Sequence, residues 1–193
     1  MKNNPLSRAE VMQQRTRKVL SLQLKTLITP IGEMLLLIDS DNFLRAADWR
    51  DYEARMQILL KRQYPGTEIL IEPETADCES CQTMMRYFDG DLDSIGSLEV
   101  RTGGTRFQNR IWQELRNIPA GQTSSYGLLA SRLGLERAAR AVGMANGANP
   151  VGVVLPCHRM IGANGNLTGY GGGLERKRWL LHHEKVHSHR GAI

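Results

Sequence analysis

The change of pattern near residue 100 constrains the fold of this chain more than any other feature. In the first half, residues 22–49 alternate short apolar runs with turn signals at 30–32 and 39–42, which predicts two or three antiparallel strands. A helix at 50–66, a strand at 67–73 and a helix near 78–90 are expected to follow. This half therefore predicts a small sheet domain.

The second half is helical and basic. Apolar stripes predict a helix at 105–119, a short helix that ends near 134, and a third helix within 136–150. Residues 1–100 carry 12 Lys and Arg against 16 Asp and Glu, a net charge of −4, whereas residues 101–193 carry 13 against 4, a net charge of +9. Two short helices in this region resemble a helix-turn-helix, and the positive charge makes nucleic acid a candidate partner. A basic enzyme that binds no nucleic acid is the alternative.

These patterns predict an α+β fold in two parts. At 193 residues, with 41% hydrophobic and 23% charged residues, the chain has the composition of an ordinary globular protein. The expected divisions are a polar extension at 1–18, a sheet domain at 19–95, a linker at 96–104, a basic, mainly helical domain at 105–184 and a solvated tail at 185–193.

The third helix of the second half carries almost no large side chains. Its small residues are Ala138, Ala139, Ala141, Gly143, Ala145 and Gly147, and its polar ones are Arg137, Arg140 and Asn146. Small residues allow a helix backbone to approach a partner closely. The pattern alone leaves two partners open, a neighbouring helix or a minor groove of DNA.

Cys157 lies in the stretch VVLPCHRMIG, after an apolar run that predicts a buried strand. A buried structural cysteine is one interpretation. A nucleophile is the other, because positive charge on His158 and Arg159 would lower the pKa of the thiol. Adjacent residues in an extended chain point to opposite faces, so a proton would pass through water to His158, with a carboxylate holding the imidazole. The carboxylates of this half are Glu114, Glu136, Glu175 and Glu184.

Cys78 and Cys81 form the motif CESC, which is half of a zinc site without further ligands nearby. We expect two free thiols and no metal. The chain has few cysteines, and its polar N-terminus has no signal core, which predicts a cytoplasmic protein. No apolar run has membrane-spanning length, so the protein is not expected to enter a membrane.

The ordered motifs GTRFQ, IPAGQTSSYG, AARAVG, NP, PCHR, GYGGG and LLHHE, within 103–184, resemble the O6-alkylguanine-DNA alkyltransferases, also called methylated-DNA–protein-cysteine methyltransferases. The resemblance implies an RNase H-like sheet domain, followed by a winged-helix-like domain with an active-site strand and loop. It implies irreversible transfer of an alkyl group from O6-alkylguanine, and less readily from O4-alkylthymine, to Cys157. No cofactor is implied, and each molecule reacts once.

The family roles fall on matching positions. Cys157 is the acceptor, His158 is the base through a water, Glu184 orients His158, and Asn149 ties the turn before the active site. Around the base pocket, Tyr126 and Lys177 assist the leaving guanine, Tyr170 forms a wall, and Asn146, Gly171 and Met160 complete the set. Gly171 stands where many members have Ser, and Met160 where valine is usual.

The resemblance also implies that the small-residue helix enters the minor groove of double-stranded DNA. Arg140 would fill the space left by the flipped nucleotide. The residues that would face the DNA are Arg137, Ala138, Ala139, Ala141 and Gly143. The protein is expected to bind DNA as a monomer. A module that only flags lesions is the alternative, but such relatives have tryptophan at the acceptor position. Regulators with an added zinc domain need more cysteines than this chain has.

Overall fold

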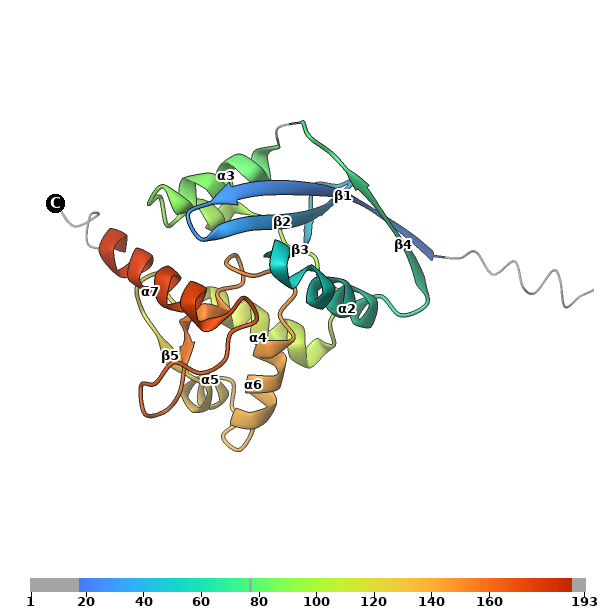
Figure 1. Ribbon diagram of the computed structural model, residues 1–193. Coiled ribbons are helices and arrows are strands. Elements are labelled where there is room, and N and C mark those ends of the chain that lie inside the picture. Colours follow the sequence, from blue (N-terminus) through green and yellow to red (C-terminus); the bar gives the residue numbers. More distant parts are fainter. Residues whose placement is uncertain (1–17, 77, 189–193) are drawn as a thin grey trace, which may run out of the picture.

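The computed structural model describes residues 18–76 and 78–188, and its first part is a four-stranded sheet (Figure 1). The strands are β1 (Lys18–Thr29), β2 (Gly32–Asp39), β3 (Leu44–Trp49) and β4 (Thr67–Pro73), in the order β3-β2-β1-β4. β1, β2 and β3 pair antiparallel, whereas β4 runs parallel to β1. The predicted meander is confirmed, with both turns where the sequence places them.

Helices cover both faces of this sheet. The first part contains η1 (Arg50–Tyr52), α2 (Glu53–Gln63), α3 (Glu79–Phe88) and η2 (Ser94–Ser97). Leu35 and Leu37 of β2 pack with Met56 and Leu60 of α2, whereas Leu36 faces the main core on the other side. Because side chains alternate along a strand, the run LLLI can bury every residue between two layers.

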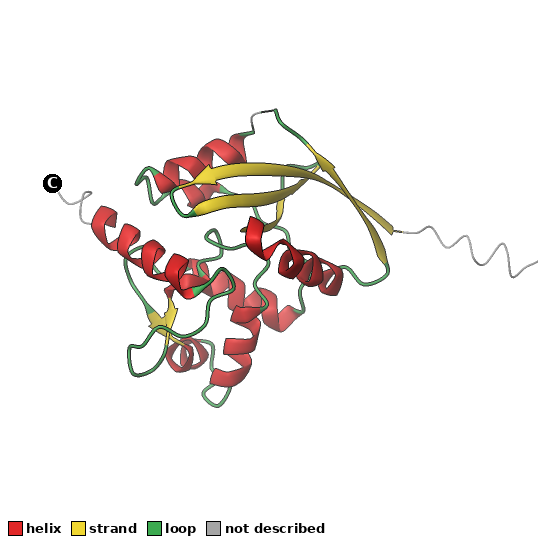
Figure 2. Ribbon diagram, in the orientation of Figure 1, coloured by secondary structure: helices red, strands yellow, loops and turns green. Residues whose placement is uncertain are grey.

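The second part is mainly helical, and Figure 2 shows its helices beyond the sheet. Its elements are α4 (Arg106–Arg116), β5 (Ser124–Ser125), α5 (Tyr126–Arg132), α6 (Ala139–Gly147), η3 (Cys157–Arg159), β6 (Met160–Ile161) and α7 (Leu174–Ser188). Thr105 and Gln108 form a capping box that starts α4, and Ser125 caps α5. The predicted α+β class and the three helices are confirmed.

The two parts share one continuous hydrophobic core. The segment expected as a linker lies against β3, where the amide of Leu44 donates to Glu99 at 2.9 Å and that of Arg101 donates to Leu44 at 3.2 Å. On the same strand, the amide of Ala47 donates to the carbonyl of Pro150 at 2.9 Å. β3 therefore connects the two parts through backbone hydrogen bonds. The domain boundaries themselves stay a prediction.

The first strand and the last helix extend beyond the boundaries that the sequence predicts. Lys18 already belongs to β1, and α7 continues past the expected boundary at 184 to Ser188, where Lys185, Val186 and Ser188 are exposed to solvent. His187 explains the extension, because its Nδ1 lies 2.8 Å from the carbonyl of His183 and its ring packs on that residue. The rest of the expected extension and tail, 1–17 and 189–193, lies outside the described residues.

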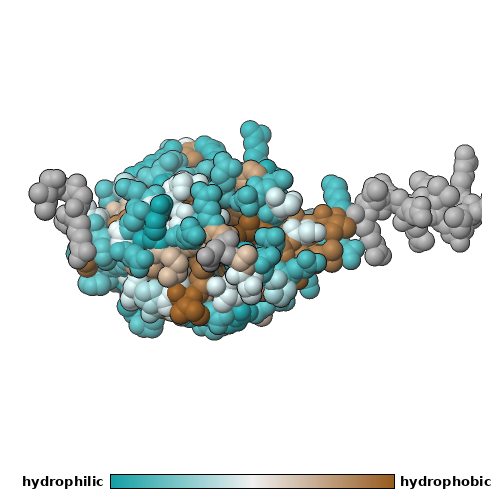
Figure 3. Space-filling model, turned by 90° about the horizontal axis from the view of Figure 1, so that it is seen from above, coloured by the Kyte–Doolittle hydropathy of each residue, from teal (hydrophilic) through white to brown (hydrophobic). Residues whose placement is uncertain are grey.

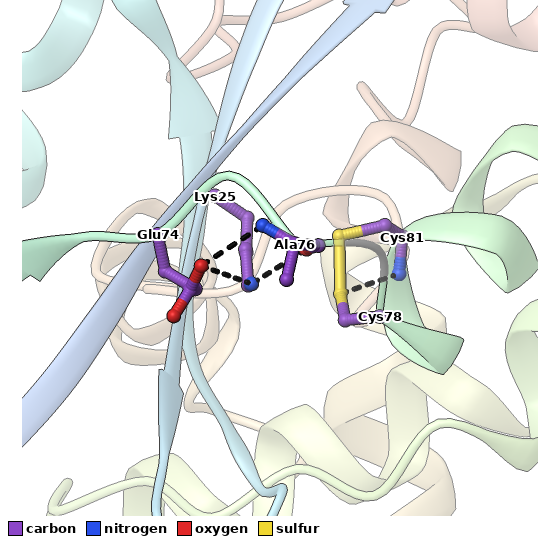
Figure 4. Close-up of a disulfide and its surroundings, with 5 residues drawn as sticks. All are labelled: Lys25, Glu74, Ala76, Cys78 and Cys81. Atoms are coloured by element: carbon purple, nitrogen blue, oxygen red, sulfur yellow. Dashed lines mark hydrogen bonds and ion pairs between the residues drawn. A yellow bond between two sulfur atoms is a disulfide. The ribbon is translucent and has the colours of Figure 1, made fainter.

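The expectation of two free thiols at Cys78 and Cys81 is also wrong. Cys78 caps the N-terminus of α3 and Cys81 lies in its first turn, which brings their Cα atoms to 5.2 Å, and the two form a disulfide (Figure 4). This separation lies within the range that disulfides require. Nearby, Lys25 of β1 donates to the carbonyl of Ala76 at 2.7 Å, which ties the segment before the disulfide to the sheet.

The surface seen from above is largely hydrophilic, with a hydrophobic patch beside the start of β1 (Figure 3). Exposed apolar residues of β1 and β4 include Val19, Leu70 and Ile71. Within 18–76 and 78–188, no helix combines the length and the apolar character needed to cross a membrane.

Candidate active site

A pocket of about 400 Å³ opens between α6 and the glycine-rich loop that precedes α7. Its lining comes from segments far apart in the sequence: Tyr126, Gly143, Asn146, Gly147, Cys157, Gly169, Tyr170 and Gly171. This volume is in the range of small-molecule sites. Cys157, with 7% of its surface exposed, is the reactive side chain that this pocket reaches.

The segment before Cys157 is not the strand that its apolar run predicts. Only Val151 bridges to β3, after which the chain turns at residues 152–154 and enters η3. Val153 has φ of 70°, and the amide of Leu155 donates back to the carbonyl of Val151 at 3.0 Å. A β-branched residue at positive φ is unfavourable by itself, so tertiary packing must hold this turn.

Asn149 bonds to both sides of this turn from inside the protein. Its Nδ2 donates to the carbonyl of Leu155 at 2.7 Å and its Oδ1 accepts from the amide of Val151 at 2.9 Å, with 2% of the residue exposed. One side chain thus satisfies polar groups on both limbs of the turn. The backbone that carries Cys157 is rigid because its buried polar groups have partners.

His158 and Glu184 form a hydrogen-bonded pair, and both are fully buried. His158 Nε2 lies 2.8 Å from Glu184 Oε1. Because an ionised carboxylate only accepts hydrogen bonds, Nε2 carries the proton and Nδ1 keeps its lone pair. Nδ1 has no partner among the residues that the structure describes. This arrangement leaves a buried basic nitrogen ready to accept a proton through water.

Besides His158, Glu184 receives donors from Arg159 of the same segment and from two further segments. Arg159 donates Nε to Oε2 at 3.0 Å and Nη2 to Oε1 at 2.8 Å, the Tyr87 hydroxyl donates at 2.9 Å, and the amide of Gly121 donates at 3.1 Å. Burial opposes ionisation, but His158 and Arg159 outweigh it and hold the pKa of the Glu184 carboxyl well below its usual range. Glu184 is therefore ionised throughout the neutral range.

The Cys157 thiol is not activated in the way that the sequence suggests. Burial raises its pKa, against a hydrogen bond from Asn149 and the positive charges of Arg55 and Lys177. The cations that lower the pKa of the thiol are thus Arg55 and Lys177, and not the adjacent His158 and Arg159, which both pair with Glu184. Burial also lowers the pKa of His158, more than Glu184 raises it. The resting pair is a thiol and a neutral imidazole, so the thiol needs a base.

Arg55, from α2, is a site residue that the sequence interpretation missed. Its guanidinium pairs with buried Asp48 and donates to the carbonyl of Gly147 at 3.0 Å. A Cβ added at Gly171 would lie 2.5 Å from its guanidinium carbon. Arg55 therefore occupies the space next to the pocket that a side chain at 171 would need. No local signal marks it as a site residue, since Gly147 and Gly171, its contacts beside the pocket, are more than 90 residues away.

Gly171→Ser is expected to displace Arg55 and to lower the free energy of unfolding by about 1–2 kcal/mol, because the Asp48 carboxylate is then left poorly paired. Urea unfolding measures the change. Gly169→Ser is the matched control, because a Cβ there meets no described atom within 4 Å. Equal stability of the two variants would contradict this role of Arg55.

The other predicted pocket residues fall into two groups. Tyr126 and Tyr170 line the pocket; the Tyr126 hydroxyl lies 3.0 Å from Thr168 Oγ1, and the Tyr170 ring meets His158 edge-on at 6.4 Å. Lys177 is fully buried and donates to the carbonyls of Met160 and Thr168 at 2.5 and 2.9 Å. Neither Lys177 nor Met160 is among the lining residues, so their contact with a bound base stays a prediction.

α6 presents two different faces. Val142, Ala145 and Asn146 are buried, and Trp112 of α4 donates to the carbonyl of Ala145 at 2.9 Å. The opposite, exposed face carries Arg140, Ala141 and Met144, with Ala139 and Gly143 half-buried between the two; just before the helix, Arg137 is exposed and Ala138 is half-buried. One face of the small-residue helix thus packs inside the protein, and the other is open to a partner beside the pocket.

Comparison with known proteins gives consistent matches. Residues 106–186 match the family described as 6-O-methylguanine DNA methyltransferase, DNA binding domain. A methylated-DNA–protein-cysteine methyltransferase of Salmonella typhimurium is 47% identical over 166 residues, which cover 86% of this chain and 97% of the relative. The crystal structure of the Mycobacterium tuberculosis O6-methylguanine methyltransferase matches with a TM-score of 0.69 at 37% identity, covering 86% of this chain and 94% of that one. A structure described as Mycobacterium tuberculosis OGT in complex with DNA matches with a TM-score of 0.64 at 34% identity, with the same coverage.

Proposed function

Because this chain belongs to the methylated-DNA–protein-cysteine methyltransferase family, it repairs DNA by moving an alkyl group from the damaged base to one of its own cysteines; we propose that the acceptor is Cys157 and the lesion O6-alkylguanine. One observation carries the assignment. Within 18–76 and 78–188, Cys157 is the one free cysteine, and it lies in a pocket beside a buried histidine–carboxylate pair.

The proposed reaction starts with proton removal. The Cys157 thiol gives its proton through a water to Nδ1 of His158, and Glu184 stabilises the imidazolium that forms. The sulfur then attacks the alkyl carbon, so that the S–C bond forms as the bond from carbon to O6 breaks. The electron pair passes to guanine, which takes up one proton. The thiol loses one proton and guanine gains one, so no cofactor is required.

Each residue around the pocket has a proposed task. The Tyr126 hydroxyl helps guanine to accept its proton, Tyr170 and Asn146 bound the base, and Lys177 stabilises developing negative charge while its ammonium holds the carbonyls of the pocket wall. The thioether product is not reversed, so each molecule acts once. O4-alkylthymine is a lesser substrate on the same chemistry.

We propose double-stranded DNA as the partner, bound by a monomer through the minor groove. An atom inside a stacked base pair cannot reach a buried thiol, so the nucleotide must be flipped into the pocket. The exposed face of α6 lies beside the pocket, and its small residues permit a close approach of the backbone. Arg140 would fill the gap in the duplex. We also propose a cytoplasmic location, the one that the sequence predicts, although a disulfide joins Cys78 and Cys81 in the structure.

Arg140→Ala is expected to slow transfer from duplex DNA by an order of magnitude or more, because the flipped state loses the side chain that replaces the base. Transfer from the free alkylated base should keep the wild-type rate. Rates under single-turnover conditions on both substrates test this role.

Arg132→Ala, at the exposed end of α5, is the matched control for Arg140. It removes a similar charge without the gap-filling role, so it should change mainly the salt dependence of binding, by about one unit of slope if it contacts a phosphate. A free-base rate that falls as far as the duplex rate in Arg140→Ala would contradict the assignment.

The proposal as a whole is tested by stoichiometry. Protein incubated with excess O6-methylguanine duplex should stop after one methyl group per molecule. Continued turnover would indicate a hydrolase built on Cys157 and His158, and tight lesion binding with no loss of thiol would indicate a module that only marks damage.

A further inference from the structure

Tyr87 lies in the last turn of α3, in the sheet part of the chain, yet its hydroxyl enters the active site. The hydroxyl donates to Glu184 Oε1 at 2.9 Å, across 97 residues of sequence, and Tyr87 has no exposed surface. We propose that Tyr87 is a positioning residue for alkyl transfer, whose hydroxyl fixes the Glu184 carboxylate and so sets the orientation and basicity of His158. This inference rests on the proposed function of Cys157.

Tyr87 is itself held from several sides. Its carbonyl lies 2.8 Å from Nε2 of His183, and its ring meets those of Phe88 and His183 edge-on at centroid distances of 5.3 and 5.4 Å. Trp179 stacks on His183 at 4.7 Å. This cluster joins α3 to α7 and locks the tyrosine ring, so the hydroxyl is pre-organised toward Glu184.

The hydroxyl and the imidazole share one oxygen. Tyr87 and His158 both donate to Oε1 of Glu184, where Arg159 also donates. A carboxylate stabilised by more donors attracts the imidazole proton less strongly, so Tyr87 weakens the pull of Glu184 on His158. Tyr87 stays protonated, because burial and the negative charge of Glu184 raise its pKa well above the usual range.

Other charged and polar groups also surround the His158–Glu184 pair. Arg159 of η3 and Lys177 of α7 oppose a positive charge on His158, and the Tyr170 ring meets the imidazole edge-on. His183 is adjacent to Glu184 but bonds to the Tyr87 carbonyl. None of these groups is removed when the tyrosine hydroxyl is deleted, so a change in His158 after that deletion reports on Tyr87.

Tyr87→Phe is the direct test, because it removes one oxygen atom and keeps the ring. Glu184 then pulls harder on the imidazole proton and the pKa of His158 rises. The base must be neutral to act, so the acidic limb of the rate against pH is expected to move to higher pH, by about half a unit to one unit. Tyr64→Phe is the matched control, since it deletes a hydroxyl that bonds to Arg45 and to the carbonyl of Arg101.

Two measurements separate the possible failures. Single-turnover methyl transfer from O6-methylguanine duplex gives the pH profile of wild type and both variants, and NMR titration of the His158 imidazole in a Cys157→Ser background needs no DNA. The proposal expects both readouts to shift upward for Tyr87→Phe and neither for Tyr64→Phe. If the pKa of the His158 imidazole does not shift in Tyr87→Phe, the proposal for Tyr87 is wrong. If wild type transfers no methyl group, the proposed role of Cys157 is wrong, and the NMR titration still decides the role of Tyr87.

Discussion

Glu184→Gln is expected to slow methyl transfer about 100-fold to 1,000-fold, which is in the range that general-base catalysis usually contributes to a rate. The amide keeps the shape of the carboxylate but not its charge, so the His158 imidazolium is no longer stabilised when the thiol gives up its proton. The measurement is the single-turnover rate on O6-methylguanine duplex at neutral pH.

The same change should lower the free energy of unfolding by about 3–5 kcal/mol, because it leaves the buried Arg159 guanidinium without its counterion. Glu175→Gln is the matched control on the same helix, since Glu175 is 89% exposed at its side chain and should lose neither rate nor stability measurably. A Glu184→Gln protein that transfers methyl groups at the wild-type rate would contradict the assigned relay.

Acidification should act on the same carboxylate. The folded-state pKa of Glu184 lies below its unfolded value, so its contribution to stability is complete above the unfolded pKa and is lost as the pH falls toward the folded one. Urea unfolding at a series of acidic pH values should therefore show wild type losing stability faster than Glu184→Gln. Parallel curves would mean that Glu184 titrates normally in the folded state.

Cys157→Ala is expected to abolish methyl transfer completely, because no other side chain in the pocket can accept the group. Binding to O6-methylguanine duplex should remain, since the exposed face of α6 and the pocket walls are unchanged. Gel shift or anisotropy measures binding, and loss of the lesion measures transfer.

The control for Cys157→Ala is the double variant Cys78→Ala/Cys81→Ala. Both cysteines lie at the N-terminus of α3 and neither lines the pocket, so their removal should leave the extent of transfer at one group per molecule. Residual transfer by Cys157→Ala, or loss of transfer in the double variant, would show that Cys157 is not the sole acceptor.

Local patterns predicted the elements of this fold well. Turn signals and periodicity placed the β1–β2–β3 meander and the helices α4, α5 and α6, because these depend on residues close in sequence. They failed at the turn before Cys157, where Val153 adopts a positive φ that β-branched residues avoid. Asn149 and the packing against β3 impose that conformation, and neither is visible in the apolar run itself.

Contacts between distant segments explain what the sequence did not reveal about the site. The family motifs gave His158 and Glu184, which the structure brings together. Arg55 and Tyr87 carry no motif in the sequence, and they reach the site only because the two parts of the chain share one core. The Cys78–Cys81 disulfide was missed for a different reason: the two residues are only three apart at the start of a helix that the sequence predicts, but the low cysteine count favoured free thiols.

The mass of the protein after reaction tests the central claim most directly. Folded protein is incubated with O6-methylguanine duplex, weighed intact and then digested for peptide mapping. The proposed function predicts a gain of one CH₂ group per molecule, located on the sulfur of Cys157, with Cys78 and Cys81 unmodified. Unchanged mass with an intact lesion, or a methyl group on any other residue, would contradict it.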